Sequence, residues 1–245
     1  MNKTTLLVTG ILLSITFSSC GQKIGKITVP KSITKITESA GLSEADIANG
    51  LKEALTKGAK MAADSLNKKD GYYKNPLMKI PFPQELSKME STLRSVGLGG
   101  EVDKFILSMN RSAENAAIES APIFTNAITK MSFADAKSIL QGADTAATSY
   151  LRKSTYDSLY KVFTPHIKKA LDNNLVASQW TNLTTQYNKL PTTRTKVNTD
   201  IVGFTTGKAL KGLFLKVAEE EGKIRNDASA RTSDLLKKVF GSQTK

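Results

Sequence analysis

The sequence has few of the residues that usually carry chemistry, since its 245 residues include one cysteine, one histidine and one tryptophan. A single cysteine excludes an intramolecular disulfide, so a hydrophobic core must stabilise the fold. The Glu-x-x-His spacing of helical metal sites is absent, as are a Gly-x-Ser-x-Gly turn, a phosphate-binding loop and paired cysteines. The histidine, His166, stands alone beside Pro165. We therefore expect no enzymatic activity, no catalytic residue, no metal and no cofactor.

Long apolar runs are also missing. The most apolar segment is Leu6–Phe17, and it is shorter than the roughly 20 residues that a helix needs to span a bilayer. It follows Lys3 and precedes Ser18 and Ser19, which is the order of charge, apolar run and small residues in a secretory signal. The sequence thus predicts a signal peptide over residues 1–19.

Cys20 follows that segment directly, and "SITFSSC" resembles a bacterial lipobox, although Phe17 occupies the position usually held by leucine. The resemblance implies cleavage before Cys20 and acylation of its sulfur and amine, and two or more acyl chains anchor a protein stably. The alternatives are an ordinary signal peptide or a buried apolar cysteine. A catalytic thiol would need a neighbouring base and an electropositive site, which this segment does not supply.

Residues 20–41 are rich in lysine, threonine, serine and glycine and have no helical stripe, so we predict a flexible basic tether. No acidic run follows Cys20, which favours a periplasm-facing protein, with the outer membrane preferred over the inner. The formal net charge is +13, but the basic residues are scattered. Besides the membrane itself, we expect anionic envelope components or envelope proteins as partners, and no nucleic acid. The sequence leaves the oligomeric state open.

Residues 42–245 carry helical periodicity, and no segment alternates long enough to indicate a strand. We predict an all-α fold, a single multi-helix bundle-like domain. Ser43 is expected to cap its first helix. The further helices are expected at 84–96, 101–120, 122–130, 132–141, 144–152, 154–173, 178–189, 200–225 and 232–240.

Two features of the first third of this domain indicate packing. Gly50, Ala54, Gly58 and Ala62 form a ridge of small residues that favours a closely packed neighbouring helix. After a turn at Asp70-Gly71, the segment 72–83 ("YYKNPLMKIPFP") is held extended by its prolines. We interpret it as a strap over the core, with a ligand-lining loop as the alternative.

Polar residues interrupt the apolar stripes of two helices. Asn110, Arg111 and Glu114 lie within an otherwise apolar helix at 102–120, and Glu220, Glu221 and Arg225 lie where a core stripe continues. Because buried charges require partners, we predict that these six residues meet in one network. The network is either a structural lock or the polar floor of a pocket for an anionic or amphipathic ligand.

Several blocks along the chain carry a resemblance to a known family. They are "GLKEALTKGA" (50–59), "MNRSAE" (109–114), "DAKSIL" (135–140), "AATSYLR" (146–152), "KALKGLF" (208–214), "AEEEGKIR" (218–225) and "DLLKKVFG" (234–241). In these blocks the chain resembles the bacterial domain-of-unknown-function family 4197 over residues 41–241. The resemblance implies an exported all-helical domain and brings no activity with it.

These observations together predict a membrane-anchored helical lipoprotein of the cell envelope with a binding or scaffolding role. The alternative is a carrier that binds a lipid-like or anionic amphipathic molecule between its helices. A distant alternative is a hydrolase that uses the Glu cluster.

Overall fold

The computed structural model describes residues 43–95, 97–173 and 200–241, together with residues 176, 180, 181, 184, 185, 188 and 196. Within these residues the regular structure is entirely helical, as predicted. The predicted signal peptide, Cys20, the tether and most of the predicted helix 178–189 lie outside the described residues. The α-helices are α2 (Glu44–Asn67), α3 (Ser87–Ser95), α4 (Gly99–Ala117), α5 (Ser120–Thr129), α6 (Phe133–Gln141), α7 (Ala146–Asn173), α9 (Ile201–Asn226) and α10 (Asp234–Gly241), and two short 3-10 helices are η1 (Gln84–Leu86) and η2 (Ala228–Ala230).

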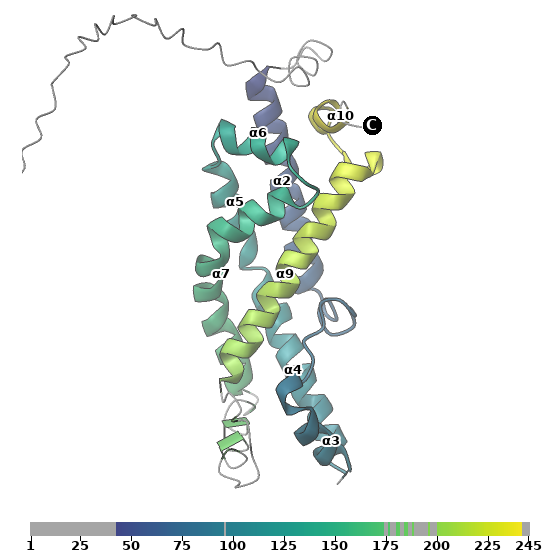
Figure 1. Ribbon diagram of the computed structural model, residues 1–245, viewed down its shortest axis with the longest axis vertical. Helices are drawn as coiled ribbons and strands as arrows, with labels where there is room; N and C mark the ends of the chain where they lie inside the picture. Colours follow the sequence, from purple (N-terminus) through teal and green to yellow (C-terminus); the bar gives the residue numbers. More distant parts are fainter. Residues whose placement is uncertain are drawn as a thin grey trace, which may run out of the picture.

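The long helices α2, α4, α7 and α9 run roughly along the long axis of the molecule (Figure 1). Helix α9 packs against α7, α2 and α4, and α5 fills the space between α2 and α7. Helices α6 and α10 lie near the end where α2 begins, whereas α3 lies at the opposite end beside α4 (Figure 1).

Two helices begin at capping serines, of which Ser43 was predicted as a cap. The Ser43 hydroxyl accepts a hydrogen bond from the Asp46 N–H, and the Asp46 carboxylate accepts one from the Ser43 N–H. Ser132 and Asp135 repeat this capping box at the start of α6. Such reciprocal bonds satisfy two helix-terminal donors from local sequence alone, so these two boundaries were predictable.

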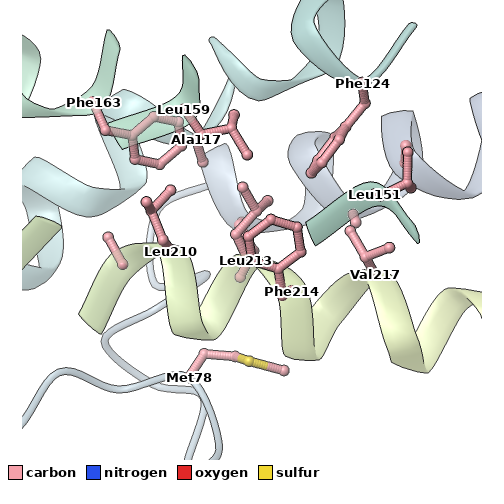
Figure 2. Packing of buried hydrophobic residues seen from close by; sticks show 14 of the residues in the cluster. Met78, Ala117, Phe124, Leu151, Leu159, Phe163, Leu210, Leu213, Phe214 and Val217 are labelled. Carbon is pink, nitrogen blue, oxygen red and sulfur yellow. The ribbon is translucent and has the colours of Figure 1, made fainter. Parts of the chain in front are cut away.

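The core is centred on α9. Its buried side chains Leu210, Leu213, Phe214 and Val217 face side chains of α5 and α7, while Met78 lies on the other side of α9 (Figure 2). The rings of Phe214 and Phe124 are 5.9 Å apart in an edge-on arrangement. This confirms the predicted core stripe of the late helix.

The ridge of small residues on α2 receives two helices, as expected. A Cβ atom added to Gly50 would lie 2.9 Å from Val239 Cγ2 of α10, and one added to Gly58 would lie 3.3 Å from Ile224 Cδ1 of α9. Between them, Ala54 is buried. The small side chains of this ridge therefore allow α9 and α10 to pack closely against α2.

Two expectations about the helices were wrong. Residues 146–173 form one helix, because the Ser154 hydroxyl donates to the Tyr150 carbonyl of its own helix and does not cap a new one. Helix α4 is not apolar all round, because it ends at Ala117 and Ile118 is 39% exposed. It buries one broad face and leaves Glu101, Asp103 and Lys104 on the other.

Candidate functional site

The predicted strap, residues 72–83, connects α2 to η1 and crosses the bundle. It contributes the side chains of Tyr72, Met78, Ile80 and Phe82 to the core. The Tyr72 hydroxyl donates to the Ala209 carbonyl of α9 at 2.9 Å. Burial raises the pKa of Tyr72, and the Glu114 carboxylate raises it further. The phenol therefore stays neutral and acts as a donor.

Glu114 of α4 holds the start of the strap. One of its carboxylate oxygens accepts hydrogen bonds from the backbone N–H groups of Tyr72 and Tyr73, both at 3.1 Å. The other oxygen pairs with Arg111 at 2.5 Å, and Arg111 also donates to Asp70 at 2.6 Å. The Arg111 guanidinium, with Lys74, holds the pKa of Asp70 below its ordinary value. A fully buried carboxylate is thus satisfied by two N–H groups and one cation.

Asn110 fastens the end of the strap. Its amide oxygen accepts from the Ile80 N–H and its amide nitrogen donates to the Ile80 carbonyl, both at 2.8 Å. The same nitrogen donates to the Ile106 carbonyl of its own helix. Asn110 therefore supplies the hydrogen bonds that the backbone of an extended segment would otherwise make to a neighbouring strand.

Glu221 and Arg225 of α9 form a second cluster. Glu221 accepts from the N–H groups of Ala147 and Thr148 at 3.0 and 2.8 Å, and from the Thr148 hydroxyl at 2.8 Å. Arg225 donates to Glu221 at 3.0 Å and to the Ile139 carbonyl of α6 at 2.9 Å. The pair thus caps the start of α7 and the end of α6, where backbone groups have no partner within their own helix.

Glu220 belongs to a third cluster, which stays on α9. Its carboxylate is 3.1 Å from the Lys216 Nζ and 2.9 Å from the Lys223 Nζ. Glu219 pairs with the same two lysines. Both lower the pKa of Glu219, Lys216 more than Lys223. Buried Glu220 is therefore neutralised by its own helix.

The prediction that these six residues meet in one network was wrong. No hydrogen bond or ion pair joins the Asn110, Arg111 and Glu114 group to Glu220, Glu221 or Arg225, all of which the structure describes. The strap that Glu114 holds meets α9 at Ala209, and Glu220 lies about 16 Å further along that helix. Glu114 and Glu221 instead meet backbone groups of distant segments, which helical periodicity does not identify. Glu220 meets lysines four residues before and three residues after it on its own helix.

A cleft of about 650 Å³ opens between the strap, α3 and α4. Its lining residues are Tyr73, Lys79, Pro81, Phe82, Pro83, Gln84, Ser87, Glu90, Arg94, Asp103 and Ile106. Arg94 is paired with Glu90 and Asp103 at 2.9 and 2.8 Å. Lys79 lies 4.8 Å from the centre of the Tyr73 ring and forms no ion pair with any residue that the structure describes. The strap is therefore both a cover for the core and one wall of a cleft.

A second, apolar pocket of about 220 Å³ lies next to the cleft and shares Phe82 with it. Its other lining residues are Leu93, Leu98, Glu101, Val102, Phe105 and Trp180. The Trp180 ring stacks on Phe105 with centres 4.8 Å apart and meets Phe82 edge-on at 5.7 Å. Sequence reasoning missed this pocket because its walls come from three separated parts of the chain.

His166 is half exposed, and its Nε2 lies 4.0 Å from a Glu119 oxygen. In the described part of the chain, no three His, Cys, Asp or Glu side chains gather as metal ligands would. None of the described helices combines the length and apolar character needed to cross a bilayer.

Fold and site together define an all-helical domain whose buried charges fasten a strap and cap helices beside a surface cleft. The profile of the family described as "Protein of unknown function (DUF4197)" matches residues 41–241. The chain belongs to this family, as the resemblance indicated. Comparison with curated proteins and with solved structures gave no match.

Proposed function

We propose that this protein is a lipid-anchored, periplasm-facing module of the cell envelope that binds a single-chain anionic amphiphile in the cleft between the strap, α3 and α4. The observation that carries the proposal is the charge arrangement in the cleft. Arg94 is neutralised by two acids, whereas Lys79 lies beside the Tyr73 ring and forms no ion pair within the described part of the chain. An anionic group entering the cleft would therefore find a cation without an acidic partner.

The rigidity of the cleft wall supports a binding role. The strap is held at its start by Glu114 and near its end by Asn110, through backbone hydrogen bonds at 2.8 to 3.1 Å. A cleft volume of about 650 Å³ falls within the range of about 300–1,000 Å³ typical of small-molecule sites. Because the wall is already ordered before binding, the binding free energy includes no entropic cost for ordering it.

The membrane anchor in this proposal is Cys20, supported by the order of Lys3, the apolar run 6–17 and the small residues before it. Cys20→Ser should release the protein from membrane fractions, and intact-mass analysis of the native protein should show fatty acids at the mature N-terminus. A bare N-terminus, or one that starts elsewhere, would overturn the anchor and leave the binding proposal to be tested separately.

Binding can be tested with the chain from residue 20 onward carrying Cys20→Ser, since the helical core lies within 43–241. The probe is 1-O-decyl-glycerol 3-phosphate, kept below its micelle-forming concentration and titrated by calorimetry. We expect saturable binding that Lys79→Met weakens about tenfold. Lys60→Met is the matched control, because Lys60 of α2 lines neither the cleft nor the neighbouring apolar pocket and pairs with Asp64. Absence of binding, or equal loss in both variants, would contradict the proposal.

The hydrolase alternative receives no comparable support. Glu114 and Glu221 are occupied by backbone N–H groups and an arginine, and Glu220 by two lysines. We therefore assign these carboxylates a structural role.

A further inference from the structure

Trp180 is the only tryptophan of the chain, and it lines the apolar pocket beside the cleft. The residue is 3% exposed, yet its indole N–H has no hydrogen-bond partner among the residues that the structure describes. Buried N–H groups are nearly always paired, and each exception calls for an explanation. Here the unpaired donor belongs to a side chain that forms the wall of a cavity.

We infer that this pocket receives the acyl chain of the amphiphile and that the Trp180 indole N–H donates a hydrogen bond to the carbonyl oxygen of its ester or amide group. The inference rests on the proposed function, because the anionic group of the same molecule would lie near Lys79. It adds the chemical class of the ligand, which is an acylated and not merely an alkylated amphiphile.

The composition of the pocket favours a hydrocarbon chain. Five of its lining side chains are apolar, those of Phe82, Leu93, Leu98, Val102 and Phe105. Glu101, the acidic residue among the described lining residues, is paired with Lys104 at 2.9 Å. Trp180 is then the lining residue whose polar group, the indole N–H, has no partner within the described chain and requires an acceptor.

The size of the pocket favours a single chain. Its volume of about 220 Å³ is below the range of about 300–1,000 Å³ for complete drug-sized ligands. A two-chain lipid would not fit. Because Phe82 lines both cavities, one chain can pass beside it while the anionic group stays in the cleft.

The test compares two probes that differ only in the carbonyl group: 1-decanoyl-glycerol 3-phosphate and its ether analogue 1-O-decyl-glycerol 3-phosphate. Both are titrated into the Cys20→Ser chain while the fluorescence of Trp180 is recorded, and calorimetry provides the affinities. We expect both to change the emission of Trp180 and the ester to bind about three- to tenfold more tightly, as one additional hydrogen bond implies. Trp180→Phe should bind both equally.

A second variant tests the pocket without touching the tryptophan. Leu98→Asp places a charge in the pocket and should weaken both probes tenfold or more. Leu98 is the N-cap residue of α4, and aspartate is a favoured N-cap, so the fold should tolerate the change. The control is Leu215→Asp on α9, because Leu215 is 44% exposed, close to the 46% of Leu98, and does not line the pocket.

The possible outcomes separate this inference from the proposed function. Equal affinity for ester and ether, or binding unaffected by Leu98→Asp but lost in Lys79→Met, would overturn the acyl-pocket inference and leave the binding cleft standing. Failure of both probes to bind the wild-type chain would overturn the proposed function itself. Tighter ester binding that disappears in Trp180→Phe would support both.

Discussion

Glu221, near the end of α9, is hydrogen-bonded at 2.8 Å to both the backbone N–H and the hydroxyl of Thr148, at the start of α7. The first N–H groups of a helix have no partner within that helix, and the helix dipole favours an anion there. Glu221, 73 residues away in the sequence, therefore caps the N-terminus of α7 in place of a local residue. These hydrogen bonds fix the orientation of α9 relative to α7.

Removal of this cap should be among the most destabilising single changes in the domain. Glu221→Ala leaves the Ala147 and Thr148 N–H groups without their acceptor and the Arg225 guanidinium without its carboxylate. Breaking such a buried pair costs about 3 to 5 kcal/mol. Urea denaturation followed by circular dichroism measures the loss. Glu219→Ala, on the 40% exposed neighbour, should stay within about 1 kcal/mol. Equal losses in both variants would contradict the capping role.

Asn110→Leu should loosen the strap. The substitution leaves the N–H and the carbonyl of Ile80 without partners, at about 1 to 3 kcal/mol for each orphaned group. Hydrogen exchange should show the Ile80 amide losing protection before the helices do. The control is Asn115→Leu on the exposed face of α4, for which we expect a change within about 0.5 kcal/mol. A fully protected Ile80 amide in the Asn110 variant would show that the strap is held by its apolar side chains alone.

Two glycines of α9 should respond to alanine in opposite directions. A Cβ atom at Gly212 would lie 2.8 Å from Tyr72 Cε1, and that ring is fully buried, whereas a Cβ atom at Gly222 would meet nothing within 4 Å. Gly212→Ala should cost about 1 to 3 kcal/mol through overpacking. Gly222→Ala should stabilise by about 0.5 to 1 kcal/mol, because glycine disfavours a helix. Thermal melting of both variants checks the signs, and a neutral Gly212→Ala would mean that the strap can move away from α9.

Arg111→Met tests whether the strap cluster is a structural lock. Glu114 would keep its two backbone donors but lose its cation, and the Arg111 side chain is 31% exposed. We therefore expect a loss of about 1 to 3 kcal/mol, in the range for hydrogen bonds to charged groups and below that for a completely buried ion pair. Lys104→Met, which breaks the exposed pair with Glu101, provides the baseline. Stability equal to wild type would refute the lock.

The pH dependence of the same cluster has a defined sign. Because Arg111, and then Lys74, lowers the pKa of Asp70 in the folded state, its stabilising contribution is complete above the unfolded-state pKa of about 3.9 and is lost as the pH falls through the lower folded-state pKa. The Tm difference between wild type and Asp70→Asn should therefore be largest above about pH 5 and shrink below pH 4. Asparagine tolerates the positive φ of 72° at this position. A difference that is constant with pH would exclude the ion pair as its source.

The sequence alone determined the helical class, the cap at Ser43, the core stripe of α9 and the course of the strap. Helix periodicity, capping and proline geometry act over a few residues, so their signals are local. Acylation of Cys20 stays a prediction from the same kind of local pattern.

Only the tertiary structure decided which groups the buried charges meet. Asn110, Arg111 and Glu114 were expected to meet Glu220, Glu221 and Arg225, but they bind the strap, whereas Glu221 binds the start of α7. A carboxylate is satisfied equally by an arginine, a lysine or a helix-terminal N–H group, so its identity does not select among them. The way the helices cross determines which of these partners each carboxylate meets. The same crossing brings Phe82, Phe105 and Trp180 into one pocket, because those contacts depend on distances through space and not along the chain.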